Sequence, residues 1–79
     1  MKIIFTRHAE QRMIERGVSK KEVEDTLFIP QKSGVKENRH FVMKTRKNGH
    51  LLIVYYLDKE GVTQIITVIT TSKVFKYLK

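Results

Sequence analysis

The stretch TRHAEQRMIERG, residues 6–17, contains the side chains of this chain that are best suited to chemistry. If it forms a helix, at about 100° per residue, His8, Arg12 and Arg16 lie within an arc of about 80° on one face. Histidine is the side chain that most readily exchanges a proton near neutral pH. Arginine can hold a phosphate through two parallel hydrogen bonds. The spacing therefore indicates an anion-binding face with a group that can transfer a proton.

The same residues also fit an ordinary solvated helix face. Three cationic groups at every fourth position repel one another by a few tenths of a kcal/mol per pair. Glu15 can pair with Arg12 at i,i+3 spacing, and exposed ion pairs of this kind contribute little to stability. A single histidine on a helix is more often a packing or solvent-facing residue than a catalytic one. Both interpretations stay open at this point.

The whole chain is strongly basic. Its 79 residues include 16 Lys+Arg and 8 Asp+Glu, which gives a formal net charge of +8. Cations concentrate in residues 1–21 and 31–50, while Glu22, Glu24 and Asp25 lie between them. Such a surface favours a polyanionic partner, and solubility alone is the alternative. Besides the helix, we expect nucleic acid to contact Arg39, Lys44, Lys47, Tyr55, Lys73 and Lys76.

Several classes of site are disfavoured by composition. The chain has no cysteine, so we expect neither a disulfide nor a thiolate-bound metal. The three histidines, His8, His40 and His50, lack the spacing of metal ligands, and we expect no metal and no cofactor. No apolar run reaches the roughly 18 residues of a membrane span, and the start lacks a signal-peptide pattern. We therefore expect a cytoplasmic protein with no membrane partner.

The first half of the chain is predicted to contain one strand and two helices. Residues 2–5 form a short apolar strand, and Thr6 is a good N-cap for a helix over 7–16 that Gly17 ends. Ser19 and Glu22 have the spacing of a capping box, which predicts a second helix over about 20–28. Pro30 stops that helix. Residues 31–38 are either a loop or a weak strand.

The second half is predicted to form a β-meander. Residues 39–46 alternate in polarity, residues 51–57 are apolar on both faces, and residues 62–70 are rich in β-branched side chains. Asn48-Gly49 and the segment 58–61 are turn signals. Residues 72–79 fit either a last strand or a short helix. The chain is thus predicted to be one α+β domain over residues 1–79, in the order β-α-α-β-β-β. Two N-terminal helices cover one face of a twisted antiparallel sheet.

The register of the middle hairpin decides which side chains face the helices. A two-residue turn at Asn48-Gly49 pairs Arg46 with Leu51 and Lys44 with Ile53. The core beneath the helices is then expected to contain Phe41, Met43, Leu52, Val54 and Tyr56. The open face is expected to carry His40, Lys44, Arg46 and Tyr55, where cations beside an aromatic ring suit phosphate contact and base stacking. An ordinary wet sheet face is the alternative.

The segment FTRHAEQRMIERGVSKKEVEDTL, residues 5–27, resembles a family of small bacterial, archaeal and phage domains of unknown function. Members of that family carry a T-x-H-A-x-x-R-M-x-E-R-G-I/V-S helix signature, to which His8, Arg12, Glu15, Arg16 and Gly17 correspond. The later LLIVYYLDKEGVTQIITVIT is similar to the closing strands of the family. The family in turn resembles a branch of the RelE-like, barnase-type toxin superfamily.

This resemblance implies a metal-independent endoribonuclease that cleaves mRNA, at the ribosome or off it, and that an acidic antitoxin protein blocks. The 2′-hydroxyl would attack the adjacent phosphate, with His8 or Tyr77 as acid or base. Arg12, Arg16 and Arg46, or Lys44 in place of Arg46, would stabilise the developing negative charge. The alternative is a non-catalytic module that binds RNA, the ribosome or a protein, which is favoured by the lack of a clear acid–base pair.

Overall fold

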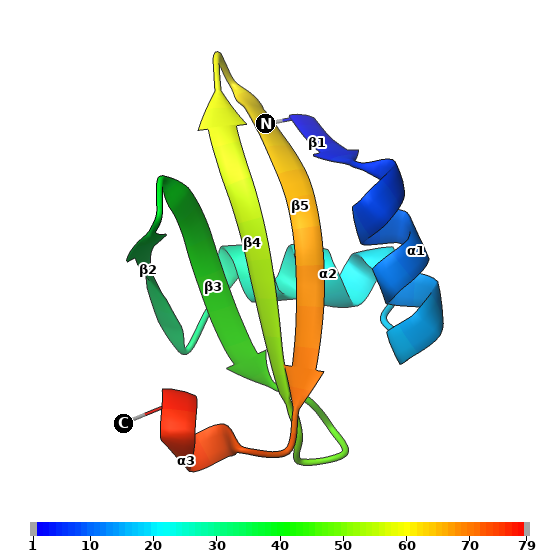
Figure 1. Cartoon of the computed structure of the whole chain (residues 1–79), viewed down its shortest axis with the longest axis vertical. Coiled ribbons are helices and arrows are strands. Elements are labelled where there is room, and N and C mark those ends of the chain that lie inside the picture. Colours follow the sequence, from blue (N-terminus) through cyan, green and yellow to red (C-terminus); the bar gives the residue numbers. More distant parts are fainter. Residues whose placement is uncertain (1, 79) are drawn as a thin grey trace.

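The computed structural model describes residues 2–78 (Figure 1). The chain forms, in order, β1 (Lys2–Phe5), α1 (Arg7–Arg16), α2 (Lys20–Phe28), β2 (Lys32–Lys36), β3 (Arg39–Thr45), β4 (Leu51–Lys59), β5 (Val62–Thr71) and α3 (Val74–Tyr77). The α+β class and the two N-terminal helices on one face of the sheet agree with the prediction. The weak strand within 31–38 is real, and the C-terminal segment contains a short helix rather than a strand.

The ends of the two long helices follow the capping residues. The Thr6 hydroxyl accepts a hydrogen bond from the Ala9 amide at 3.1 Å, and Gly17 ends α1 in the left-handed region at φ 65°. The Ser19 hydroxyl accepts from the Glu22 amide at 3.1 Å, which is half of the predicted capping box. The Glu22 carboxylate points elsewhere, and its partner lies in the candidate site described below.

The five strands form one sheet in the order β1-β5-β4-β3-β2. Four of them make an antiparallel meander, but β1 pairs with β5 in parallel, from Lys2 opposite Val62 to Phe5 opposite Ile65. The sheet is therefore mixed, and the prediction of an entirely antiparallel sheet was wrong on this point. β1 and β5 are distant in sequence, so no hairpin dictates their relative direction.

The loop between β3 and β4 is one residue longer than predicted. The Arg46 amide donates to the His50 carbonyl at 2.7 Å, and the Gly49 amide donates to the Arg46 carbonyl at 3.0 Å. This closes a loop of Lys47, Asn48 and Gly49, with Gly49 at φ 86°, the left-handed conformation of the third residue in such hairpins. Thr45 then pairs with Leu51.

The longer loop reverses the faces predicted for β3. Because side chains alternate along a strand, a shift of one residue moves each of them to the opposite face. Phe41 and Met43 lie away from the two long helices, whereas Val42 packs in the core beneath them. His40, Lys44 and Arg46 share the face of Val42, and the prediction that they lie on an open face with Tyr55 was wrong. Tyr55 lies on the opposite face.

Apolar side chains are buried on both faces of the sheet. The helix-covered core consists of Ala9, Met13, Val18, Val23, Val42, Leu52, Val54, Ile65 and Val68. The smaller cluster on the other face consists of Met43, Leu51 and Ile53, and Phe41, Tyr55, Val74, Tyr77 and Leu78 pack against it. α2 passes behind the sheet in Figure 1, while α3 lies at the end of the sheet where β3 and β5 stop.

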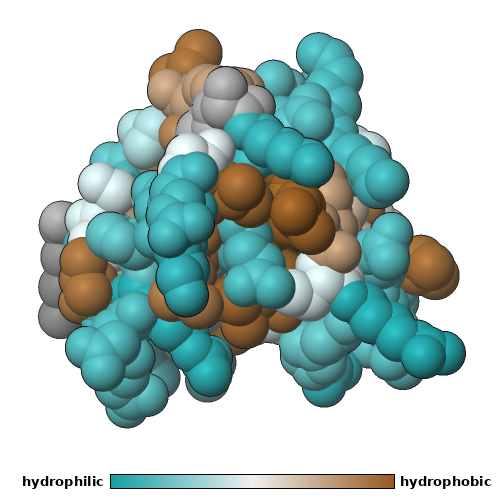
Figure 2. All heavy atoms as spheres, turned by 90° about the horizontal axis from the view of Figure 1, so that it is seen from above, coloured by the Kyte–Doolittle hydropathy of each residue, from teal (hydrophilic) through white to brown (hydrophobic). Residues whose placement is uncertain are grey.

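The end of the molecule with the β4–β5 turn has a patchy surface. Seen from that end, hydrophobic side chains gather in the middle and hydrophilic ones surround them (Figure 2). The loop of Lys47, Asn48 and Gly49 lies at the opposite end of β4. Within residues 2–78, none of the helices has the length and apolar character needed to cross a membrane.

Candidate nucleic-acid interface

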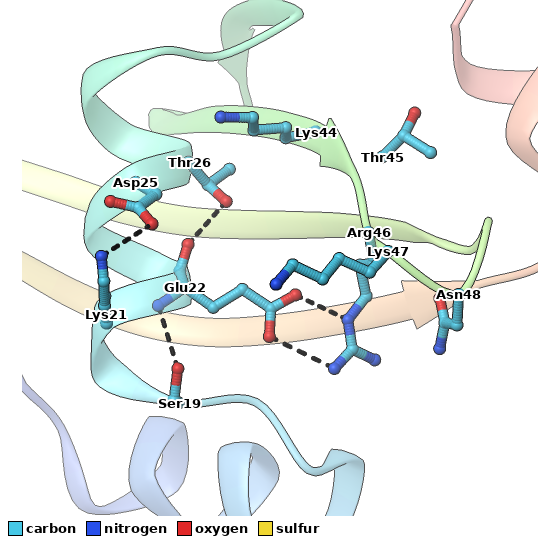
Figure 3. Close-up of a pocket in the computed structure, with 10 residues that line it drawn as sticks. All are labelled: Ser19, Lys21, Glu22, Asp25, Thr26, Lys44, Thr45, Arg46, Lys47 and Asn48. Atoms are coloured by element: carbon cyan, nitrogen blue, oxygen red, sulfur yellow. Dashed lines mark hydrogen bonds and ion pairs between the residues drawn. The ribbon is translucent and has the colours of Figure 1, made fainter.

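A groove of about 570 Å³ runs between the first turns of α2 and the end of β3 with its following loop. One wall carries Ser19, Lys21, Glu22, Asp25 and Thr26, and the other carries Lys44, Thr45, Arg46, Lys47 and Asn48 (Figure 3). The hairpin register creates this groove, because it places Lys44 and Arg46 on the face of the sheet that α2 covers. Every lining residue is polar or charged by type, and the carbon atoms of these side chains contribute much of the surface.

Arg46 ties the two walls together. Its Nε donates to Glu22 Oε2 at 2.7 Å and its Nη2 donates to Glu22 Oε1 at 3.2 Å, which makes a bidentate ion pair. The same Nη2 also donates to the Gly17 carbonyl at 3.1 Å. Carbonyls at the C-terminus of a helix lack a partner within the helix, and Arg46 supplies one here. The Arg46 side chain is 14% exposed. This arginine therefore joins the end of α1, the start of α2 and the hairpin.

The groove has a positive balance. Its lining includes the four cations Lys21, Lys44, Arg46 and Lys47 and the two carboxylates of Glu22 and Asp25, which leaves a net charge of +2. Both carboxylates are engaged: Glu22 by Arg46, and Asp25 by Lys21 with an N–O distance of 3.8 Å. The Lys21–Asp25 pair is exposed, so it contributes little and opens easily.

The side chains of Lys44 and Lys47 make no hydrogen bond or ion pair within the described part of the chain. Both side chains extend from the strand and its loop in the direction of α2 (Figure 3). These two ammonium groups have no counter-charge, because the carboxylates of the facing α2 wall, Glu22 and Asp25, are already in ion pairs. They therefore attract an anion from solution. Each has three donors for phosphate oxygens.

His8, Arg12 and Arg16 do not line this groove, although Arg46 contacts the carbonyl of Gly17, the residue that follows Arg16. His8 and Arg16 are exposed, and Arg12 Nη1 lies 3.0 Å from Glu15 Oε1, which confirms the predicted i,i+3 pair. At about 1.5 Å per residue, the helix carries His8 roughly 14 Å from Gly17, the residue that Arg46 contacts. Arg12 is paired with Glu15, whereas Arg46 is paired with Glu22. His8 takes part in neither ion pair.

The remaining predicted site residues are distributed over other surfaces. Tyr77 and Tyr55 pack on the cluster of the opposite face, so the sheet separates them from Arg46. Lys73 precedes α3 and Lys76 lies in its last turn, where the Lys76 ammonium is 5.8 Å from the Tyr77 ring centre. Arg39 begins β3, at the end of the strand far from the groove. Of the predicted nucleic-acid contacts, Lys44 and Lys47 line the groove, and of the predicted catalytic residues only Arg46 does.

The α2 wall was missed from sequence. No site role was predicted for Lys21, Glu22 or Asp25. The i,i+4 spacing of Lys21 and Asp25 was a readable signal of their pairing. The pairing of Glu22 with Arg46 had no local signal, because it depends on how the hairpin is placed against α2.

A second polar cluster lies at the other end of the helix-covered face. The rings of His40 and Tyr56 stack with centres 5.3 Å apart, and the Thr63 hydroxyl donates to Asp58 Oδ1 at 2.6 Å. Burial raises the pKa of Tyr56 above its usual value of 10.0, and the charge of Asp58 raises it further. Among residues 2–78, no group of three His, Asp or Glu side chains lies close enough to hold a metal ion.

A family model described as "Domain of unknown function (DUF4258)" matches residues 5–70. The chain belongs to this family. The match includes α1 and both walls of the groove, and it ends before α3 and Tyr77. Searches of curated proteins and of solved structures found no match.

Proposed function

We propose that this DUF4258 protein binds RNA through the groove between α2 and the β3–β4 hairpin. The observation that supports this most strongly is the pair Lys44 and Lys47, which face the groove without counter-charges while both nearby carboxylates are held in ion pairs. The basic surface of the rest of the chain, with a net charge of +8, adds long-range attraction for a polyanion.

Binding without cleavage fits the geometry better than catalysis. Cleavage by 2′-hydroxyl attack needs a proton acceptor or donor within hydrogen-bond reach of the reacting atoms, beside cations that stabilise the phosphorane. His8 is roughly 14 Å along α1 from the Gly17 carbonyl that Arg46 contacts, and Tyr77 is on the opposite face of the sheet. The ribonuclease implied by the RelE-like resemblance therefore stays a prediction, and the same experiment tests it.

A single experiment separates the two functions. Purified protein is incubated with a labelled mRNA in EDTA, with and without ribosomes, and both the bound fraction and the length of the RNA are measured. We expect salt-sensitive binding and intact RNA. Cleavage that His8→Ala abolishes would establish the ribonuclease instead, and intact RNA together with absence of binding at low salt would reject both functions.

Paired variants with equal charge changes locate the binding surface. Lys44→Gln with Lys47→Gln removes the two unpaired ammonium groups of the groove. Lys36→Gln with Lys59→Gln removes two exposed lysines from the opposite end of the sheet. We expect the first pair to weaken RNA binding and the second to leave it nearly unchanged. Equal loss in the two variants would show that net charge, rather than the groove, carries the binding.

The proposed role also defines where partners are to be sought. We propose the cytoplasm, where mRNA and ribosomes are found, as the location of the protein, and the ribosome as an RNA surface that the groove contacts. The RelE-like resemblance adds an acidic antitoxin protein as a proposed partner. A reading frame for a small acidic protein next to the gene, whose product co-purifies with this chain, would support that proposal.

A further inference from the structure

We infer that the groove recognises base-paired RNA through its backbone, independently of sequence, rather than an unpaired strand. This inference rests on the RNA binding proposed above and narrows its substrate class. It follows from what lines the groove, where the aromatic rings lie, and how an ion pair joins its two walls.

The groove offers contacts for phosphates and sugar hydroxyls but no aromatic ring for the faces of bases. Its lining consists of lysine, arginine, carboxylate, hydroxyl and amide side chains. Proteins that hold unpaired RNA or DNA combine a basic groove with aromatic side chains, on which successive bases stack at roughly 1–3 kcal/mol each. Recognition of paired RNA depends instead on phosphate and 2′-hydroxyl contacts.

The aromatic residues of the chain all lie outside the groove lining. Three of them, Phe41, Tyr55 and Tyr77, pack on the opposite face of the sheet, and Tyr56 is stacked on His40. Phe5 packs against the helix-covered core. The two strongly exposed rings, Phe28 at 62% and Phe75 at 86%, belong to the end of α2 and to α3.

The Arg46–Glu22 ion pair holds the two walls at a fixed separation. A partner whose phosphates are already ordered can meet Lys44 and Lys47, and Lys21 once its weak pair with Asp25 opens, without further loss of the partner's own conformational freedom. An unpaired strand must be ordered on binding, and without stacking it receives little in return. A duplex, which is stiff before it binds, therefore suits this groove better.

The test compares ligands of equal length on the full chain. An unpaired oligouridine of about 20 nucleotides and two RNA duplexes of about 20 base pairs with unrelated sequences span more than the roughly 16 base pairs that double-strand binders contact. Fluorescence anisotropy measures each affinity at about 50 mM and about 200 mM salt. We expect both duplexes to bind equally and at least about tenfold more tightly than the single strand.

The variants test whether the groove is responsible. Each lost phosphate contact is expected to reduce the slope of log affinity against log salt by about 1, so Lys44→Gln with Lys47→Gln should reduce it by about 2. Lys36→Gln with Lys59→Gln should not change the slope. Single-strand binding as tight as duplex binding, or a marked difference between the two duplexes, would overturn the inference while leaving RNA binding intact. Failure of every ligand to bind would reject RNA binding itself.

Discussion

At the scale of single residues, Arg46 makes the most consequential contacts of the described chain. It forms a bidentate ion pair with Glu22 and a further hydrogen bond to the Gly17 carbonyl. The pair is more buried than the exposed Arg12–Glu15 pair, whose side chains are 44% and 43% exposed. Burial removes competing water, so loss of one partner leaves the other poorly solvated.

We expect Arg46→Ala to lower the free energy of unfolding by about 2 kcal/mol, since hydrogen bonds to charged groups contribute roughly 1.5–3 kcal/mol. Arg46→Lys should recover part of this, because lysine keeps the charge but cannot make the bidentate contact. Chemical denaturation monitored by circular dichroism measures both. Arg12→Ala is the control and should cost below about 1 kcal/mol. Equal costs for Arg12→Ala and Arg46→Ala would contradict the anchoring role.

Tyr56 gives a prediction about pH. Its pKa is raised above 10.0 by burial and then by the charge of Asp58, so the folded state favours the neutral phenol. The unfolded chain loses this proton at lower pH. The stability that Tyr56 contributes is therefore complete below its ordinary pKa and is lost as pH rises through the raised folded-state pKa.

Phenolate absorbance followed from about pH 9 to about pH 12 should show a late titration step, above the ordinary tyrosine pKa of about 10. Tyr56→Phe should remove that step. The free energy of unfolding of Tyr56→Phe should also fall less steeply with alkaline pH than that of the wild type. An unchanged late step in Tyr56→Phe would assign it to another tyrosine.

At the scale of elements, β2 and β3 pack closely where the Phe41 ring lies against Gly34. Gly34 lies opposite Phe41, and a Cβ on Gly34 would lie 2.6 Å from Phe41 Cζ and 2.9 Å from Cε2. The ring of Phe41 therefore covers the backbone of an edge-strand glycine, while Phe41 itself packs on the Met43 cluster. A side chain at this position would displace the Phe41 ring.

We expect Gly34→Ala to lower the free energy of unfolding by about 1–3 kcal/mol, because the Phe41 ring must move from its packed position. In a Phe41→Leu background the same change should cost less, since the shorter side chain leaves room for the methyl group. A double-mutant cycle on the four proteins measures this coupling. Strictly additive costs would show that the ring does not depend on the glycine.

The elements themselves were largely readable from the sequence, whereas their register was not. Thr6, Gly17 and Ser19 mark helix ends through hydrogen bonds within a few residues, and the bounds of α1 and α2 follow from them. The Asn48-Gly49 pair correctly indicated a hairpin, yet it fits loops of two and of three residues. That one-residue difference moved Lys44 and Arg46 to the helix face. The parallel pairing of β1 and the contact of Glu22 with Arg46 depend on distant segments and had no local signal.

At the scale of the whole molecule, charge and groove make separable contributions to binding. The net charge of +8 attracts any polyanion, whereas the groove offers a particular arrangement of donors. Long-range attraction is strongly screened when the Debye length shrinks to about 8 Å at physiological salt. Contacts inside the groove should therefore account for most of the affinity that remains there.

This separation predicts different behaviour on two matrices. Lys44→Gln with Lys47→Gln and Lys36→Gln with Lys59→Gln both lower the formal charge from +8 by two. We expect the two variants to leave a cation-exchange column at similar salt concentrations, because retention follows net charge. They should differ on immobilised duplex RNA, from which the groove variant elutes earlier. If the two variants also elute together from the duplex RNA column, the groove makes no contribution beyond net charge.

The parallel pairing of β1 with β5 also affects how the chain is made. β1 and α1, residues 2–16, both contact β5, which begins at Val62. During synthesis, the buried side of α1, with Ala9 and Met13, has no strand to cover it until most of the polypeptide has been translated. Contacts so distant in sequence are slow to form. We therefore expect β1 and α1 to be the last elements to pack into the fold, after β5 has been translated.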